Sequence, residues 1–577
     1  MNERGTLALP WRWPLLTAIL LLAAFFRLYR LPTMPWGLSQ DEVVNADISL
    51  NVLTEGGAPF LSGGFGHEPL FHYLQGVTLT LFGDNVIGIR MPAVMVGTLL
   101  VAAGYTLMRR MWGPVAAIAT AVGLSVSWWP VIFSRIGIRA ITFPLLLTLA
   151  IISLRRGLTL RRRALVILAG LLFGLTLYTY TSARVVPALA LAWLMHATIF
   201  HRTGLQRHRK ALLGAALVAI VVVAPLVLYL SAHPEIQERV RQLQGPLTAL
   251  RQGDPGPLAR SVLDTLTMFS RNGEGRWTYG IPGRPILDVL SGALFYLGLI
   301  RCALHVRRPA CGLLGPWLLI ALAPSMVTPD APSSIRAIGA LPAAYGMIGV
   351  GTAWLWEWMA DRGRTVRVGL LVALGLVGAL HAGLTWRAGF GTWASHHEVY
   401  WLYKAHFADI AAFLDRQSAS RPMVVFEAWV DPVDVRGLRR DLIHDERQPR
   451  WAQAGRSFVW PAGADRFTLA FPIYSQADPD VWRLFAGDPP VTSVSPFHMP
   501  DGRPGVTFYT IETEPVLSRF RARASTASVT LPQSTEAIPL PINFGHQIAF
   551  LGYQVLDAGG ARPGGELRLI TLWRVLR

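Results

Sequence analysis

Two adjacent acidic residues, Asp41 and Glu42, lie shortly beyond the first long apolar segment of the chain. A carboxylate beside a membrane surface can act as a general base and take a proton from a hydroxyl or an amine. His67 and Glu68 close the same polar segment and can bind a metal ion or a phosphate, or orient Asp41. The alternatives are a solvated acidic pair and a loop cap followed by a turn that Pro69 begins.

Arginines in short loops are the second group of residues whose type and spacing could serve chemistry. An arginine at a membrane face costs least when it has an anion to bind, and its planar guanidinium matches a phosphate. We expect at least two of four such arginines to bind a lipid phosphate; the alternative is snorkelling to phospholipid head groups. Arg90, at the start of the second apolar run, is a further candidate or a helix anchor. The four arginines are Arg135, Arg139, Arg184 and Arg336.

The elements that would position these residues are long apolar runs between residues 14 and 386. A helix that crosses a bilayer needs about 20 mostly apolar residues. The pattern therefore predicts an α-helical polytopic membrane protein with about eleven transmembrane helices. The expected spans are 14–31, 86–108, 114–133, 140–154, 164–181, 185–200, 211–231, 286–304, 311–327, 337–356 and 367–386.

Basic residues concentrate in alternate loops, which predicts a cytoplasmic N-terminus in the cell membrane. The run after Trp13 has no small-residue cleavage site, so we interpret it as an uncleaved helix and not as a signal peptide. An odd number of helices then places the C-terminal tail outside. Residues 32–85 and 232–285 become long outer loops, and Pro257–Phe269 is expected to be a short amphipathic helix.

The tail differs in composition from the membrane domain, which we assign to residues 1–389. Residues 390–515 alternate short apolar strands with Pro and Gly turns, which indicates a small α/β domain. Residues 516–577 resemble the start of a β-sandwich, with strands at Gln547–Val555 and Glu566–Arg574 around a Gly-rich turn. Too few strands follow to close a sandwich, which favours a truncated module.

Composition excludes two other classes of protein. The net charge of +18 first suggests nucleic-acid binding, but topology explains many of the arginines, and we reject that function. The only cysteines, Cys302 and Cys311, allow neither a disulfide framework nor a Cys-based zinc site. No cofactor is demanded by any motif; a divalent metal stays an open alternative because no ligand spacing stands out.

Taken in order, these motifs resemble the GT-C superfamily of membrane glycosyltransferases. The group most similar is that of the protein O-mannosyltransferases and lipid A aminoarabinose transferases, glycosyltransferase family 39. The resemblance rests on the following segments: Asp41-Glu42, His67-Glu68-Pro69-Leu70, Arg90-Met91-Pro92, Ser134–Ala140 and the Tyr-Thr run that ends at Arg184. Glu68 departs from the usual His-Pro-Pro-Leu turn.

The resemblance implies a hexosyl- or pentosyltransferase that inverts the sugar of a polyprenyl-phosphate donor at the extracytoplasmic face. The acceptor would be a lipid, a protein or a cell-envelope glycan. By the same resemblance, Asp41 is the general base and Glu42 is its neighbour or helps to bind the acceptor. The departure at Glu68 leaves the role of that turn open.

Two other functions compete with a transferase. A polytopic transporter of a lipid-linked or small anionic substrate would also use arginines in its membrane domain. Transporters commonly carry paired repeats and interrupted helices in matching positions, and neither is evident here. A third hypothesis is that the tail binds carbohydrate and the membrane domain only anchors it. Eleven helices are more than anchoring needs.

Overall fold

The structure is a computed structural model with two compact units, Met1–Lys404 and Ala405–Arg577. The division falls close to the end of the membrane domain expected at residue 389; the further division of the tail stays a prediction. The described residues are 12–237, 245–360, 362–417, 421–461, 463–483, 489–524, 528–530, 537–556 and 568–576.

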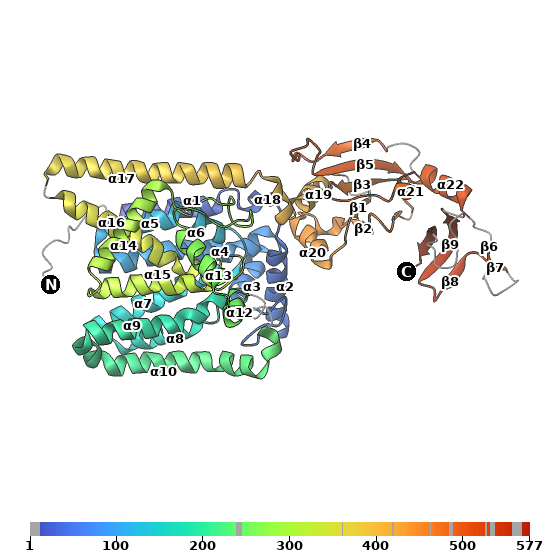
Figure 1. Ribbon diagram of the computed structural model, residues 1–577. Helices are drawn as coiled ribbons and strands as arrows, with labels where there is room; N and C mark the ends of the chain where they lie inside the picture. The colour runs from blue at the N-terminus through green and yellow to red at the C-terminus, as the bar shows by residue number, and fades with distance from the viewer. Residues whose placement is uncertain are drawn as a thin grey trace. The chain divides into compact units, whose positions relative to one another are not determined.

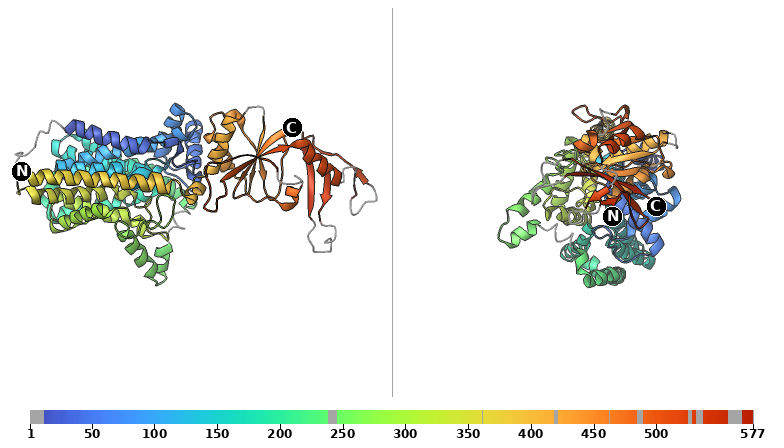
Figure 2. Two further views of the ribbon diagram at one scale, coloured as in Figure 1. Left: turned by 90° about the horizontal axis from the view of Figure 1, so that it is seen from above. Right: turned by 90° about the vertical axis from the view of Figure 1, so that its right-hand side faces the viewer.

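The first unit is a bundle of long helices that lie side by side (Figures 1 and 2). Among the described residues, eight segments are long and apolar enough to cross a membrane, and three shorter apolar helices accompany them. These segments coincide with the eleven expected spans, so the chain is a multi-pass α-helical membrane protein. The helices are α1 (Arg12–Leu28), α4 (Val86–Trp112), α5 (Pro114–Val126), α7 (Thr142–Leu160), α8 (Arg163–Thr176), α9 (Val186–Phe200), α10 (Arg202–Ala232), α14 (Val289–Leu304), α15 (Pro309–Met326), α16 (Leu341–Ala360) and α17 (Arg364–Thr385).

The expected span 114–133 is broken at Ser127, so the prediction of one continuous helix was wrong there. Helix α5 ends at Val126, and a short helix α6 (Trp128–Phe133) follows in a new direction. Pro130 explains the break, because in a continuous helix its ring would clash with the carbonyl of Val126. The Ser127 side chain is used instead in a hydrogen bond of 2.7 Å to Nε2 of His381.

The expected outer loops are largely helical. The first contains α2 (Gln40–Glu55) and α3 (Leu70–Phe82). Helix α2 begins with a capping box, in which Ser39 and Glu42 each bond the other's backbone N–H. The second loop contains η4, α12 and α13, and α13 confirms the expected amphipathic helix. Their bounds are Pro234–Gln237, Gly245–Arg251 and Gly256–Thr267; α13 is followed by the irregular segment 268–288.

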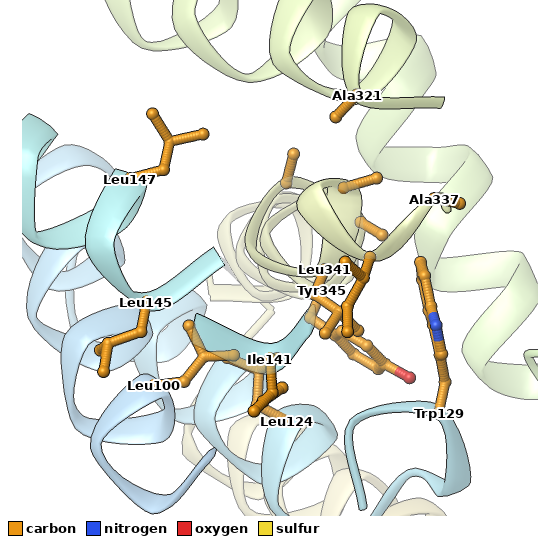
Figure 3. Close-up of a cluster of buried hydrophobic side chains, with 14 of the residues drawn as sticks. Leu100, Leu124, Trp129, Ile141, Leu145, Leu147, Ala321, Ala337, Leu341 and Tyr345 are labelled. Carbon is orange, nitrogen blue, oxygen red and sulfur yellow. The ribbon is translucent and has the colours of Figure 1, made fainter. Parts of the chain in front are cut away.

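Helix α16 is the centre of the bundle and is almost wholly buried, whereas α10 and α17 are mostly exposed. Figure 3 shows Leu341 and Tyr345 of α16 among side chains of α4, α5 and α7. Glycines let its neighbours approach closely: a Cβ on Gly298 of α14 would lie 1.9 Å from the carbonyl oxygen of Met347. Small residues at helix contacts are typical of membrane bundles, where backbone approach replaces the hydrophobic driving force.

The unit Ala405–Arg577 contains helices and β-sheets among its described residues, as expected for the fold class of the tail. Its main sheet has the strand order β2-β1-β3-β5-β4, with β1 parallel to β2 and β3, and β5 antiparallel to β3. A second sheet has the order β10-β9-β8, and a third pairs β6 with β7. The expected Gly-rich turn before residue 568 lies outside the described residues. The elements are α19 (Ala405–Arg416), β1 (Met423–Glu427), α20 (Pro432–Asp441), β2 (Arg450–Gln453), β3 (Arg466–Pro472), α21 (Pro479–Trp482), β4 (Val491–Val494), β5 (Val506–Glu512), α22 (Thr513–Arg523), β6 (Ser528–Thr530), β7 (Ala537–Pro539), β8 (Ile542–Phe544), β9 (Ile548–Val555) and β10 (Leu569–Val575).

Candidate active site

The two adjacent acids lie in the first turn of α2 and have opposite environments. Asp41 is exposed, while the side chain of Glu42 is fully buried. Consecutive residues of a helix point about 100° apart, so one carboxylate can face the bundle while the next faces outward. Both acids also complement the positive end of the helix dipole.

Glu42 is held by donors from three segments of the chain. Its Oε1 accepts hydrogen bonds from Arg90 Nε at 2.8 Å and from the Gly137 backbone N–H at 3.0 Å. Its Oε2 accepts from the backbone and hydroxyl of Ser39, each at 3.1 Å, and from a second Arg90 nitrogen at 3.3 Å. This saturated carboxylate ties α2 to α4 and to the segment 134–140.

Arg90 and Arg135 bind the backbone between the end of α1 and the start of α2. Both side chains are buried, and their terminal nitrogens donate to seven carbonyl oxygens at 2.6–2.9 Å. Arg90 donates to Leu31, Pro35 and Gly37, and Arg135 donates to Phe26, Arg27, Tyr29 and Met34. The structure therefore places these two predicted phosphate ligands within the wall of the site, not at its surface.

His67 belongs to a chain of polar side chains under α2. Its Nδ1 lies 3.1 Å from Nε2 of His72, and Nδ1 of His72 lies 3.1 Å from the Ser49 hydroxyl. Ser49 in turn donates to Gln75 at 2.8 Å. Burial lowers the pKa of both imidazoles, and the positive charge of Arg139 lowers it further, so both rings are neutral at physiological pH.

Glu68 pairs with Arg139, the arginine that the sequence already marked as a phosphate ligand. Nε of Arg139 lies 3.2 Å from Oε2 of Glu68, and the Thr181 hydroxyl donates to Oε1 at 3.0 Å. The Arg139 guanidinium also lies over the ring of Tyr180, 5.4 Å from its centroid. The turn after His67 and the Tyr-Thr run before Arg184 thus meet at one place, although the chain separates them widely.

Three tyrosines share the electrostatic environment of Asp41. Burial raises the pKa of the Tyr279 phenol above its ordinary value, and the negative charge of Asp41 raises it further. Burial also raises the pKa of Tyr180, which the charges of Arg139 and Arg336 lower and those of Glu68 and Asp41 raise. Tyr403 is buried as well and responds to the charges of Glu42 and Asp41.

Glu274, on the segment 268–288, belongs to the same environment. Its Oε2 accepts from the backbone and the hydroxyl of Ser334. Burial raises the pKa of this carboxyl, whereas Ser334 and the charges of Arg276 and Arg336 lower it. Sequence analysis did not find Glu274 or Tyr279, because each is a lone residue whose neighbours come from distant segments. It also missed His72, although His72 stands only five residues beyond His67.

Arg184 is exposed and, with Glu68, borders an opening of about 320 Å³. Leu177 and Val227 line this opening and also line a larger groove of about 1020 Å³. The groove is almost entirely apolar and runs between α8, α9 and α10. Among the described residues, no group of three or more His, Cys, Asp or Glu side chains is arranged to hold a metal ion.

Fold and site together describe a multi-pass membrane protein with a carboxylate and arginine site at one end of its bundle. Residues 66–229 match the family of dolichyl-phosphate-mannose-protein mannosyltransferases. The chain is thus similar to the GT-C membrane glycosyltransferases, as the motifs indicated. No curated protein matches the sequence.

Comparison with solved structures returned further proteins at low likeness, among them the three that follow. ArnT from Cupriavidus metallidurans bound to undecaprenyl phosphate is 17% identical, covers 87% of this chain and 98% of its own, and has a TM-score of 0.46. The oligosaccharyltransferase of Archaeoglobus fulgidus is 13% identical over 77% of this chain and 64% of its own, with a TM-score of 0.44. Arabinosyltransferase EmbB from Mycobacterium smegmatis is 13% identical over 72% and 44%, with a TM-score of 0.33. Likeness at this level assigns neither a substrate nor the role of any residue.

Proposed function

We propose that this protein is an inverting glycosyltransferase that moves a hexose or pentose from a polyprenyl-phosphate carrier to an acceptor at the extracytoplasmic face of the cell membrane. The acceptor is a lipid, a protein or a cell-envelope glycan. One observation carries the proposal: a large apolar groove shares residues with an opening that Arg184 borders together with Glu68, the ion-pair partner of Arg139. Family similarity over residues 66–229 supports the same class of reaction.

Asp41 acts as the general base in this proposal. It takes the proton from the acceptor's hydroxyl or amine while the acceptor atom forms a bond to the anomeric carbon of the sugar. The bond from that carbon to the phosphate oxygen breaks, and the polyprenyl phosphate leaves with the electron pair. Attack opposite the leaving phosphate inverts the anomeric centre. Glu42 has a different part, because its lone pairs are occupied and it fixes the start of α2.

Phosphate binding falls to Arg139, Arg184 and Arg336. Arg139 is fixed by Glu68 but is still partly accessible, and Arg184 is exposed. A guanidinium offers paired N–H donors that suit a leaving phosphate. Arg90 and Arg135 are left out of this set because backbone carbonyls occupy their terminal nitrogens. Glu68 acts on the phosphate through Arg139, whose side chain it orients, and His67 supports the same turn.

The apolar groove between α8, α9 and α10 supports a lipid-linked donor. It adjoins the opening beside Arg184, so a polyprenyl chain can lie in the groove while its phosphate reaches the arginines. The helices along the groove are either long and apolar enough to cross a membrane or belong to the shorter apolar helices. The arginines supply the positive charge that a metal would otherwise supply, and we propose that the reaction needs no metal cofactor. Turnover that disappears with a chelator and returns with Mg²⁺ or Mn²⁺ would contradict this part of the proposal.

The test of the function is a transfer assay with membranes that contain the protein. The membranes are incubated with a panel of radiolabelled polyprenyl-phosphate hexoses and pentoses, and the label is followed into lipid, protein and glycan fractions. We expect one donor to lose its label with the wild-type chain and to keep it with Asp41→Asn. Label that crosses sealed vesicles without leaving its carrier, equally in both proteins, would favour a transporter and refute the transferase.

A further inference from the structure

A further pocket, about 480 Å³ in volume, shares residues with the candidate active site. It is bounded by the segment 268–288, by α14 and α17, and by the short helix α6. Glu274 and Tyr279 line it, and the pKa of Tyr279 responds to the charge of Asp41. The cavity therefore shares Glu274 and Tyr279 with the candidate site, although nothing in the reaction described above uses it.

Rigid aromatic side chains form much of its wall. Three indole N–H groups that would otherwise compete for a ligand are bound to backbone carbonyls: Trp128 to Tyr279 at 2.8 Å, Trp129 to Ser334 at 3.0 Å and Trp393 to Trp277 at 2.7 Å. The Trp128 ring lies directly on Gly389, where a Cβ would come within 2.0 Å of it. These rings are fixed before any ligand arrives, and their faces are apolar.

Two carboxylates lie among these rings. Asp288 caps α14 through two backbone N–H groups and pairs with Nδ1 of His381, so its oxygens are engaged. Glu274 differs, because Ser334 binds only Oε2. Its Oε1 accepts no hydrogen bond from the residues that the structure describes. The cavity thus offers a fixed, half-engaged carboxylate together with aromatic side chains.

We propose that this cavity is a binding subsite for a sugar ring. A sugar ring has apolar C–H faces and hydroxyl groups at its edge, so it needs flat apolar walls together with a few fixed acceptors. Trp128, Trp129 and Trp393 supply the walls, and Oε1 of Glu274 supplies an acceptor for a hydroxyl. A pocket of mostly apolar lining with a few placed polar groups is the usual form of a small-ligand site. This inference rests on the proposed function, because that function supplies the sugar substrate. The ring belongs either to the donor or to a glycan acceptor.

Gly292 allows the cavity to be filled without disturbing the fold. This glycine of α14 is buried and lines the cavity, yet a Cβ at this position would meet no atom within 4 Å. The substitution Gly292→Leu should therefore occupy the space meant for the ring. Gly375 of α17 is the matched control, because a Cβ there also meets nothing within 4 Å but the residue is exposed. Glu274→Gln is a second variant, with Glu357→Gln at an exposed position of α16 as its control.

Binding is measured on the full chain in nanodiscs by saturation-transfer NMR, with methyl glycosides of hexoses and pentoses as probes. We expect saturable transfer to at least one glycoside in the wild type, its loss in Gly292→Leu and its retention in Gly375→Leu. In Glu274→Gln the Ser334 N–H retains the amide oxygen, so the pocket is left with an NH2 group that cannot accept from a sugar hydroxyl. Binding should weaken about ten-fold or more, while Glu357→Gln binds as the wild type. Displacement of the glycoside by a polyprenyl-phosphate sugar would assign the subsite to the donor ring, and its persistence would assign it to an acceptor ring.

The inference and the proposed function fail in different ways. If no glycoside binds to the wild type, or if Gly292→Leu and Glu274→Gln bind as tightly as the wild type, the subsite is refuted even where sugar transfer proceeds. If glycosides bind and Gly292→Leu abolishes binding while no donor loses its label, the subsite is supported and the proposed transferase function is refuted.

Discussion

The sharpest prediction concerns a single change, carboxylate to amide, made at two neighbouring positions. Asp41→Asn and Glu42→Gln remove the same charge and nearly preserve shape, one residue apart in the first turn of α2. Their environments differ completely, because Asp41 is exposed and Glu42 is buried against Arg90. The two variants should therefore fail in opposite ways.

The cost at Glu42 follows from its partners. An amide at this position turns one of two acceptor atoms into a donor, whereas five donor contacts from Arg90, Gly137 and Ser39 converge on the carboxylate. The guanidinium of Arg90 then stays buried without a counter-charge. Breaking a buried ion pair by removal of one partner costs about 3–5 kcal/mol. We expect Glu42→Gln to lower the free energy of unfolding by about this amount, with turnover per folded molecule less affected.

Asp41→Asn should leave the fold nearly unchanged. It loses a favourable interaction with the helix dipole, worth about 0.3–1 kcal/mol. The loss of a general base instead lowers kcat by about 10²–10⁴-fold. Binding of the lipid-linked donor should survive, because the phosphate ligands lie on other segments.

The assay combines thermal unfolding in nanodiscs with transfer of label from the donor, normalised to folded protein. Near-normal turnover in Asp41→Asn together with loss of turnover in a stable Glu42→Gln would exchange the roles of the two acids. Normal turnover in both variants would refute the catalytic assignment. Unfolding of Glu42→Gln at the wild-type temperature would refute the view that this carboxylate anchors α2.

Three further predictions concern the phosphate ligands, pH and topology. Arg139→Ala should weaken donor affinity by roughly ten- to a hundred-fold, with partial rescue by Lys, and unchanged affinity would make Arg139 a structural residue only. The pKa values of His67 and His72 are depressed below 6.5 in the folded state. Their contribution to the free energy of unfolding is therefore complete above about pH 6.5 and is lost as the pH falls below that value. The loss is about 1.4 kcal/mol per imidazole at pH 5.5. Unfolding temperatures at pH 7.5 and 5.5 should thus differ less in His67→Asn and His72→Asn than in the wild type, and equal differences would contradict the argument. A cysteine at exposed Ser518 of the tail should react with an impermeant thiol reagent in intact cells, while one at Thr159 should react only after lysis; the reverse pattern would invert the topology.

The helices of the membrane unit could be predicted from the sequence because run length and apolar character are local properties. The break at Ser127 could not, since membrane helices often tolerate a proline and only the packing decides whether the helix continues. Here the Ser127 hydroxyl finds His381 of α17, a partner far along the chain. The helices inside the first outer loop were missed for a different reason: α2 has 16 residues and α3 has 13, and a search for apolar runs of about 20 residues passes over helices of that length.

Sequence analysis predicted several residues of the site but not the contacts between them. The sequence marked Asp41, Glu68 and Arg139, and the structure brings Glu68 and Arg139 into contact. Sequence analysis could not tell that Arg90 and Arg184 have different surroundings, because both lie next to an apolar run. Their difference lies in partners: carbonyl oxygens of a distant loop surround Arg90, and Arg184 faces outward. Spacing along the chain carries no information about such contacts.

The adjacency of the two acids has a physical consequence for catalysis. Glu42 is joined to Arg90 of α4 and to the backbone of Gly137, so the first turn of α2 has a fixed position relative to both segments. A base one residue away, Asp41, is therefore held in the same turn. Arg90 therefore acts on turnover through the placement of Asp41. Its replacement by Met should, like Glu42→Gln, lower stability and reduce kcat of the folded fraction by much less than Asp41→Asn does, while the affinity of the folded fraction for the donor stays unchanged, in contrast to Arg139→Ala.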